Sequence, residues 1–328
     1  MSILRYIVLA LIGLMILALT WMAVEVFYPR ESQEQIVRIH AGDNARVISN
    51  KLEQASIITS AAGFRLVARL RKADRDLKPG VYVFGGKASL WQTVSRLWDG
   101  RSESIRITFP EGWSLYRTLK RIEQSGLMDY KSLYAAATDT ALVRSLTGMK
   151  LKSLEGFLYP DTYQFPIDCG ADSILGLQTA EFFRKLTQAG INPHEISDFY
   201  QKLILASIIE KEAGNDDERG IIAGVFQNRL KLGMALQSCP TVDYILEQRG
   251  IRREVLTTND TGIPSPYNTY LNPGLPPTPI CNPRIESIQA ALNPAKHKYL
   301  YFFSDRQGNN VFSSSYEEHQ RLQRKLGV

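Results

Sequence analysis

The sequence predicts a mixed α+β protein that follows one N-terminal membrane-spanning helix. Three observations predict this fold class. A long apolar stretch opens the chain, short alternating segments followed by a glycine turn and a helical pattern recur before residue 130, and helical spacing of apolar residues dominates the C-terminal half. The chain has 328 residues, 44% of them hydrophobic and 22% charged, which is enough for two ordinary globular domains.

The opening stretch "YIVLALIGLMILALTWMAV" (residues 6–24) carries no charge between Arg5 and Glu25. About 20 such residues cross a bilayer as a helix, and Trp21 and Tyr28 are expected to anchor it at the far interface. A cleaved signal peptide is the competing interpretation, although its apolar core is normally shorter and no clear small-residue cleavage site follows.

Flanking charges indicate the orientation of this predicted span. Arg5 and the amino terminus lie on one side, whereas Glu25 and Glu31 offset Arg30 on the other. The excess of positive charge therefore favours a cytoplasmic N-terminus, with the residues after about 28 outside the membrane.

Strand–turn–helix units follow the span. "VRIHAGDNARVISNKLEQASII" (residues 37–58) resembles "IRITFPEGWSLYRTLKRIEQSGLM" (residues 105–128), with Gly42 matching Gly112, and residues 80–100 form a third, partial copy. Each predicts a short strand, a glycine turn and a helix. Units of this size suit small binding modules, and structural packing alone would explain them too.

The remainder is predicted to be mainly helical. Residues 155–166, "EGFLYPDTYQFP", are expected to form a loop or short strand. Helices are expected over 173–189, over 193–232 with a break near Gly214, over 284–292, and at the C-terminus around His319; "KYLYFFSD" and "NNVFSSS" are expected to be strands on either side of a turn.

The composition excludes several classes of function. The net charge is +6, but the densest basic run, residues 65–78, contains two aspartates and is predicted to be a solvated helix face, so no nucleic-acid partner is expected. The cysteines form no CxxC pair and the histidines no HExxH motif, so neither a metal site nor a cofactor is expected; a Cys169–Cys281 bridge stays open. These residues are Cys169, Cys239, Cys281, His40, His194, His297 and His319.

Two glutamates close the apolar run "ASIIEKEAG", residues 206–214. On a helix at about 100° per residue, Glu212 shares a face with Leu205 and Ile208, whereas Glu210 lies nearly opposite. Burial raises the pKa of a carboxyl and suits it to general acid catalysis, which makes Glu212 a candidate catalyst. The competing interpretations are that Glu212 pairs with an arginine such as Arg219 or Arg229, or that it only ends the helix.

Further polar residues interrupt apolar patterns. Asn228 lies on the apolar face of the following helix, where a buried amide needs a partner: a catalytic carboxyl, a sugar amide or the core. "YNTY" (residues 267–270) combines aromatic rings with an amide in a proline-rich loop, which is typical of sugar-binding surfaces and also of packed loops.

Several motifs in order resemble the endolytic murein transglycosylase family. They are "EGFLYPDTY", "ASIIEKEA", "VFQNRLKLGMALQSCPTV", "YNTY", "GLPPTPICNP" and "YLYFF". The resemblance implies a transmembrane helix with a cytoplasmic stub at 1–28, a LysM-like module at 36–104 and a catalytic domain at 105–328. It also implies an inner-membrane protein with its catalytic domain in the periplasm or outside.

The resemblance implies one reaction and one catalyst. The family cuts nascent peptidoglycan within the glycan strand, at the β-1,4 bond between N-acetylmuramic acid and N-acetylglucosamine, and leaves 1,6-anhydro ends. The expected partners are glycan strands, the membrane and peptidoglycan synthases (penicillin-binding proteins). The family's catalytic glutamate is the second of the EKE pair, which is Glu212. The expected substrate-binding residues are Asn228, Ser238, Tyr267, Asn268 and Tyr270, and the expected supporting residues are Glu210, Glu155 and Asp161, with Glu210 either supporting or on the surface.

Two departures from the family and two rival functions remain. Cys239 stands where aspartate is typical, which puts an acidic role there in doubt, and Thr278 stands where glycine is common. One rival is a hydrolase that uses Glu212 with Glu155 or Asp161 as a second carboxylate. The other is a membrane-anchored glycan-binding scaffold, for which Glu212 would be dispensable.

Overall fold

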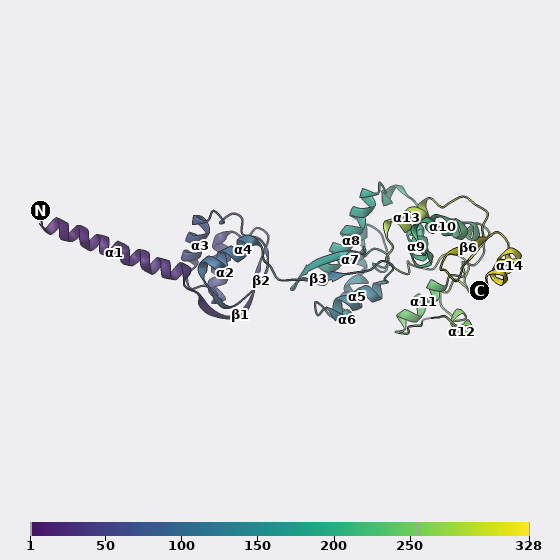
Figure 1. The fold of residues 1–328 in the computed structure, drawn as a ribbon, viewed down its shortest axis with the longest axis horizontal. Helices are drawn as coiled ribbons and strands as arrows, with labels where there is room; N and C mark the ends of the chain where they lie inside the picture. The colour runs from purple at the N-terminus through teal and green to yellow at the C-terminus, as the bar shows by residue number, and fades with distance from the viewer. Residues whose placement is uncertain (1, 254, 328) are drawn as a thin grey trace. The chain divides into compact units, whose positions relative to one another are not determined.

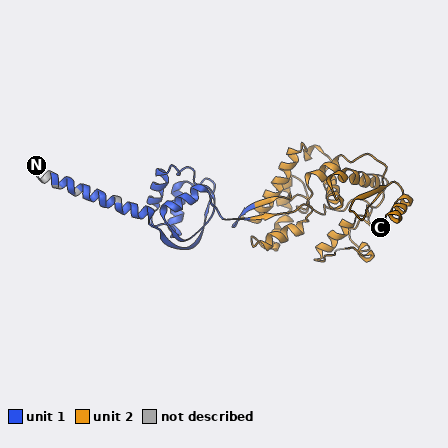
Figure 2. Ribbon diagram, in the orientation of Figure 1, with its two compact units in different colours: residues 1–105, 164–168 blue, residues 106–163, 169–328 orange. Residues whose placement is uncertain are grey.

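A computed structural model of the chain describes residues 2–253 and 255–327, and these divide into two compact units. Unit 1 comprises residues 1–105 and 164–168, and unit 2 comprises residues 106–163 and 169–328 (Figure 2). Unit 1 contains α1 (Ser2–Phe27), β1 (Arg30–Ile39), α2 (Ala45–Gln54), α3 (Ala61–Leu70), β2 (Gly80–Ala88) and α4 (Leu90–Asp99). Two further strands, β3 (Ser104–Thr108) and β4 (Thr162–Pro166), pair where the chain passes from one unit to the other.

The N-terminal helix α1 matches the predicted apolar span. Within the described residues, the segment Ile7–Phe27 is the one helix long and apolar enough to cross a membrane. A signal sequence near the N-terminus also meets these criteria of length and apolar composition, so both interpretations of this helix agree with the structure.

Two of the three strand–turn–helix units, at residues 37–58 and 80–100, lie in the globular part of unit 1, whereas residues 106–128 of the remaining one belong to unit 2 (Figure 1). Strands β1 and β2 pair antiparallel, with Val37 opposite Tyr82. Helices α2, α3 and α4 bury their apolar faces in the same core, where Ile48, Phe64 and Leu97 are inaccessible to solvent. Gly42 in the turn before α2 has a φ of 92°, a conformation that favours glycine.

The predicted helix face over residues 65–78 is wrong in its extent. Helix α3 ends at Leu70, and Lys72 adopts a left-handed φ of 57°, which a helix does not continue through. The basic residues after Leu70 therefore lie in a turn rather than on a helix.

Unit 2 is mainly helical. It contains α5 (Leu115–Gln124), α6 (Tyr130–Ala137), α7 (Thr140–Thr147), α8 (Ala171–Gln188), the 3-10 turn η1 (Pro193–Glu195), α9 (Phe199–Glu212), α10 (Asp216–Lys231), α11 (Cys239–Gln248), α12 (Thr258–Thr261), α13 (Ile285–Leu292), β5 (Tyr301–Ser304), β6 (Asn310–Ser313) and α14 (Tyr316–Leu326). The helices predicted near 173–189, 193–232, 284–292 and His319 are confirmed, and so are the last two strands, which pair antiparallel.

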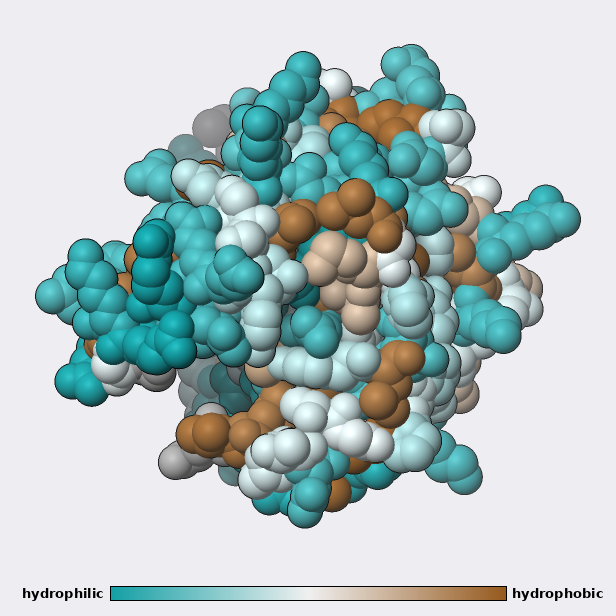
Figure 3. Space-filling model, turned by 90° about the vertical axis from the view of Figure 1, so that its right-hand side faces the viewer, coloured by the Kyte–Doolittle hydropathy of each residue, from teal (hydrophilic) through white to brown (hydrophobic). Residues whose placement is uncertain are grey.

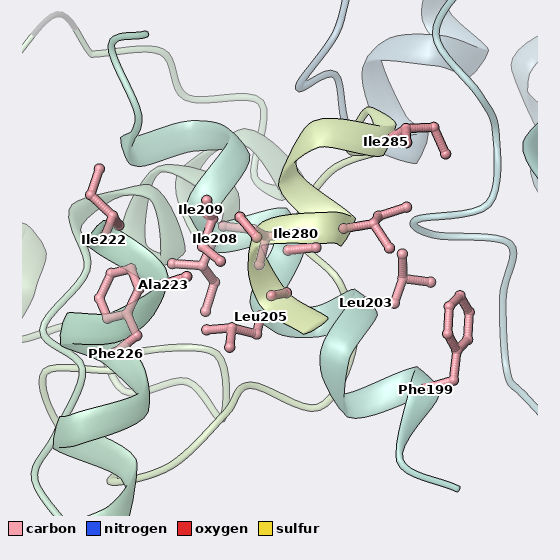
Figure 4. Packing of buried hydrophobic residues seen from close by; sticks show 14 of the residues in the cluster. Phe199, Leu203, Leu205, Ile208, Ile209, Ile222, Ala223, Phe226, Ile280 and Ile285 are labelled. Atoms are coloured by element: carbon pink, nitrogen blue, oxygen red, sulfur yellow. The ribbon is translucent and has the colours of Figure 1, made fainter. Parts of the chain in front are cut away.

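Helix α9 lies at the centre of the core of unit 2. Every residue from Leu203 to Glu210 is buried, and the aliphatic side chains of α9 pack against Ile222 and Phe226 of α10 and against α13 (Figure 4). Because α9 is covered on all sides, it has no solvated face in this stretch. The end of unit 2 seen in Figure 3 is in contrast mainly hydrophilic, with hydrophobic residues in small separate groups.

Candidate active site

Glu212 is the last residue of α9, where the central helix emerges from the core. Its side chain is partly buried. The hydroxyl of Ser238 donates a hydrogen bond of 2.6 Å to its Oε1. Arg219 pairs with Glu210, and no described residue forms an ion pair with Glu212, so the predicted alternative of an arginine partner is wrong.

Local sequence explains why Ser238 is available to Glu212. Ser238 is the N-cap of α11, a position whose hydroxyl normally accepts from the backbone amides of the first turn. Pro240 in that turn has no N–H, and the Ser238 hydroxyl makes no capping bond. The backbone of Ser238 is fixed instead, because its N–H donates to Thr269 Oγ1 at 3.0 Å and its carbonyl accepts from Thr241 Oγ1 at 2.7 Å.

The carboxyl of Glu212 has an unusual proton affinity. Burial raises its pKa to about 7; the Ser238 hydrogen bond opposes this rise, the charge of Asp243 adds to it and Arg229 lowers it. At neutral pH the group is therefore present in both protonation states. A carboxyl in this condition can donate a proton and later accept one.

Asp243 was not predicted to have a role, and Arg229 was predicted only as a possible ion-pair partner of Glu212. Arg229 is buried, and its guanidinium donates to the carbonyls of Leu300 at 2.6 Å and Leu236 at 2.8 Å. It thereby joins α10 to the residue before β5 and to the segment before Ser238. For Asp243, its place one turn after Cys239 in the same helix was the available signal.

Tyr270 and Cys239 lie beside Glu212. The Tyr270 hydroxyl and the Cys239 thiol are 3.0 Å apart, and the charge of Glu212 raises the pKa of both groups after the larger effect of their burial. Tyr270 and Ser238 are thus the two predicted substrate-binding residues that the structure brings to Glu212. Cys281 is a buried free thiol that donates to the carbonyl of Ser207, so the bridge to Cys169 is absent.

Of the two interpretations of Glu210, supporting residue or surface charge, the second is wrong. It is not a surface charge: it is more deeply buried than Glu212. Its carboxylate accepts from Ser287 Oγ at 2.7 Å and from the backbone N–H of Arg284 at 3.2 Å, and it pairs with Arg219 at 3.4 Å. It thus fastens α9 to α10 and to the start of α13, two residues before Glu212.

The other two predicted carboxylates are engaged elsewhere. Glu155 is buried, accepts from the N–H of Leu115 at 2.9 Å and from the Tyr244 hydroxyl at 3.1 Å, and burial raises its pKa to about 8. Asp161 is exposed, and its side chain accepts from the N–H of Thr162. Neither is among the charged groups that shift the pKa of Glu212.

Two predicted sugar-binding amides hold the protein's own backbone. The amide nitrogen of Asn228 donates to the carbonyls of His297 at 2.9 Å and Tyr299 at 3.1 Å. Asn268 is fully buried, donates to the carbonyls of Thr261 and Ile263, and accepts from the N–H of Tyr270. These bonds use both donors of each amide, so neither amide can donate to a sugar. Asn268, whose oxygen is also engaged, has a structural role, whereas substrate binding through the side-chain oxygen of the partly buried Asn228 stays a prediction.

Tyr267 lies outside the immediate surroundings of Glu212. Its hydroxyl is 2.9 Å from that of Thr278, and its ring centre is 5.0 Å from that of Tyr244. It lines a cleft of about 480 Å³ that also contains Glu155. This cleft is separate from the group formed by Glu212, Ser238 and Tyr270.

A larger cleft of about 590 Å³ lies beside the C-terminal end of α9, and Glu212 itself is not among the residues that line it. Lys211, the residue before Glu212, and Asp243 line it together with the aromatic rings of Trp113 and Tyr116 and the guanidinium of Arg252. Aromatic faces beside charged groups can hold a polar polymer. No group of three or more metal-binding side chains occurs among the described residues.

Comparison with known proteins identifies the family. The sequence profile of the YceG-like family matches residues 37–325. The chain belongs to the YceG-like family. This confirms the resemblance drawn from the motifs around Glu212.

Curated relatives of this YceG-like protein carry one functional name. An endolytic murein transglycosylase of Bacillus subtilis (strain 168) is 29% identical over 306 residues, which cover 88% of this chain and 84% of the relative. A protein of the same name from Streptococcus pneumoniae is 28% identical over 317 residues; the alignment covers 87% of this chain but 57% of the longer relative. The crystal structure of a YceG-like protein from Listeria monocytogenes, 32% identical, superposes with a TM-score of 0.57 over 89% of this chain and all of its own.

Proposed function

We propose that this YceG-like protein is an endolytic lytic transglycosylase. It cleaves the β-1,4 bond between N-acetylmuramic acid and N-acetylglucosamine of nascent glycan strands and leaves 1,6-anhydromuramyl ends, which terminates elongation of the strand. The observation that carries the proposal is the Glu212 carboxyl, whose pKa of about 7 and single hydroxyl donor suit it to act as acid and then as base.

Glu212 acts first as an acid. The protonated carboxyl donates its proton to the glycosidic oxygen, the bond to the muramyl C1 breaks, and positive charge develops on that carbon and is shared by the N-acetyl group. The Ser238 hydroxyl then stabilises the carboxylate that Glu212 has become, because a hydrogen bond to a charged acceptor is stronger than one to a neutral acceptor.

Glu212 acts next as a base. Its carboxylate accepts the proton of the C6 hydroxyl, and the C6 oxygen attacks C1 and closes the 1,6-anhydro ring. The proton given in the first step is thus recovered, and no water enters the product. One carboxyl serves both steps, in contrast to glycosidases that need a pair.

The 590 Å³ cleft, which Lys211 and Asp243 line, is where the glycan would lie. Trp113 and Tyr116 offer ring faces to the sugars, and Tyr270 and the Cys239 thiol flank Glu212 on the side of α11. Sugar rings pack on aromatic faces with their apolar C–H surfaces, while their hydroxyls need polar partners at the rim.

A two-carboxylate hydrolase is the second candidate, and one observation bears on which acid it would use. Asp243 is the carboxylate whose charge acts on Glu212, whereas Glu155 and Asp161 do not. A hydrolytic reaction would therefore use Asp243 to activate water. Hydrolysis leaves a reducing muramic acid end, so the products separate the two reactions.

The rest of the chain would place this chemistry at the membrane. We propose that α1 is an uncleaved single span with the N-terminus in the cytoplasm, that residues 36–104 are a LysM-like module, and that residues 105–328 form the catalytic domain outside the inner membrane. Peptidoglycan synthases are the proposed protein partners, since they make the strands that this reaction ends. The glycan-binding scaffold remains the non-enzymatic alternative.

Mass spectrometry of the products tests the reaction. The full chain in detergent is incubated with uncrosslinked glycan strands, beside Glu212→Gln and beside Glu317→Gln, an exposed glutamate of α14 that serves as the matched control. We expect anhydromuramyl ends from the unaltered chain and the control, and a loss of at least about 10²–10⁴-fold in Glu212→Gln. Reducing ends would support the hydrolase, and equal products from Glu212→Gln would exclude Glu212 as the catalyst.

A further inference from the structure

Unit 1 carries an exposed apolar patch beside the end of α1. We define the patch as Phe27 of α1, Leu66 and Leu70 of α3, and Trp91 and Trp98 of α4. Leu66 is 41% exposed, Leu70 72%, and Trp91 and Trp98 37% each. Large exposed apolar side chains on neighbouring helices of a small module are normally covered by something.

Ring contacts join the patch to the N-terminal helix. The ring centres of Phe27 and Trp91 are 5.4 Å apart. The guanidinium of Arg71 lies 4.4 Å from the ring centre of Trp91 and 5.0 Å from that of Trp98, and it also donates to Ser95 Oγ. Both α3 and α4 contact α1, and Figure 1 shows α3 on the side of the module that α1 joins.

The length of the apolar span determines how deep in the bilayer the contact between Phe27 and Trp91 lies. The segment Ile7–Phe27 has 21 residues, and at about 1.5 Å per residue it is roughly 30 Å long, the thickness of the hydrocarbon core. Phe27 therefore lies at the edge of the core when α1 crosses a bilayer. Trp91, in contact with Phe27, then lies in the interfacial layer, where tryptophan is the preferred residue.

We propose that this patch docks unit 1 on the lipid surface. The proposal rests on the membrane span assigned to α1 above. The two tryptophans enter the interface and Leu66 and Leu70 reach toward the acyl chains. Arg69 and Lys72, exposed next to Leu70, lie beside them and attract anionic headgroups. Arg71, stacked between the tryptophans, keeps its charge at the level of the headgroups.

A saccharide ligand fits the patch less well. Sugars stack on open aromatic faces, but Trp91 is already flanked by Phe27 and by the guanidinium of Arg71. Leu66 and Leu70 are aliphatic side chains and give a sugar neither a ring to stack on nor a hydrogen bond. A module that binds glycan would therefore use another face.

Depth-dependent quenching of tryptophan emission tests the proposal. Four full-length proteins each keep one of Trp21, Trp91, Trp98 and Trp113, the others being changed to phenylalanine, and are reconstituted in bilayers whose lipids carry bromine near the headgroup end of the acyl chain. We expect Trp91 and Trp98 to lose most of their emission and Trp113 of unit 2 to keep its emission. Trp21 reports on the span itself.

A matched pair of variants links the quenching to the patch. Leu70→Glu in the Trp98-only protein should restore emission, whereas Val47→Glu, at an exposed apolar residue of α2, should not. Unchanged quenching in Leu70→Glu would show that Trp98 reaches lipid without the patch and would overturn the proposal.

Four other outcomes would also refute docking of the patch on the lipid surface. Quenching of Trp21 but not of Trp91 and Trp98 would refute the docking and leave the span intact. Absence of quenching at Trp21 would refute both. Quenching that varies with the ratio of protein to lipid would assign the patch to a second copy of the chain, and protection of Trp91 from acrylamide by glycan strands alone would assign it to a saccharide; either result overturns lipid docking.

Discussion

Glu212→Gln is expected to stabilise unit 2 at alkaline pH while it abolishes cleavage. A carboxyl whose pKa rises from 4.5 to about 7 on folding destabilises the charged native protein by about 3 kcal/mol, at 1.36 kcal/mol per pH unit. Glutamine keeps the shape and the acceptor for Ser238 but carries no charge. The charged carboxyl therefore lowers the free energy of unfolding of the unaltered chain, and the variant lacks this effect.

The dependence on pH follows from the sign of the shift. Below pH 4.5 the carboxyl is protonated in both the folded and the unfolded chain, so the penalty is absent. It grows as the pH rises through the window from 4.5 to about 7 and is complete above that. The gain from Glu212→Gln should therefore be near zero at pH 4 and about 3 kcal/mol at pH 8.5, roughly 6–12 °C in Tm for a unit of this size.

Thermal unfolding of the Trp113-only protein in detergent measures this gain, because its emission reports on unit 2. The control is Glu317→Gln, whose side chain is exposed and should change Tm little at either pH. An equal gain at pH 4 and pH 8.5, or no gain at pH 8.5, would refute the reasoning, since both results would mean that burial does not raise the pKa of Glu212.

Three other variants test the surroundings of this carboxyl. Ser238→Ala removes the hydrogen bond that lowers the pKa of Glu212, so the alkaline limb of the pH–rate profile should move upward and the rate should fall about tenfold, the worth of a hydrogen bond to a charged group. Cys239→Asp adds a negative charge beside Glu212 and should move the same limb upward in a pH–rate profile without removing cleavage. Glu210→Gln removes the buried carboxylate that pairs with Arg219, which then keeps only Asp216 as an acidic partner, and should destabilise unit 2 by about 3 kcal/mol in denaturant unfolding.

Patterns within short stretches of the sequence predicted most of the secondary structure. The glycine turns at Gly42 and Gly112 both adopt a positive φ, as the matching units predicted. The span α1, the helices α8 to α10 and the pair β5–β6 follow from apolar runs, breakers and turn residues that lie within a few positions of each other. The end of α3 was missed because Lys72 is not a residue type that signals a left-handed turn.

Burial of polar groups depends on contacts that no local pattern encodes. Helical periodicity separated Glu210 from Glu212 on the assumption that α9 has one solvated face, but α9 is covered on all sides up to Glu210. The partners of Glu210 come from α10 and α13, up to 77 residues away. The prediction that Asn268 binds substrate was wrong for the same reason. Its side-chain amide donates to backbone carbonyls of its own loop, and a sequence motif does not reveal such contacts.

Three buried or partly buried glutamates of unit 2 show what separates a candidate catalyst from a structural acid. Glu210 is paired with Arg219 and Arg284 within the core, so it holds helices together. Glu155 has a raised pKa, but its two oxygens accept from a backbone amide and from Tyr244. Glu212 combines a raised pKa with one donor, Ser238, and with a position at the end of its helix, next in the chain to Lys211, which lines the 590 Å³ cleft. A carboxyl can exchange a proton with a ligand only when its pKa is raised and one of its oxygens accepts no hydrogen bond from the protein. The raised pKa keeps the proton available near neutral pH, and the unbonded oxygen can contact the ligand.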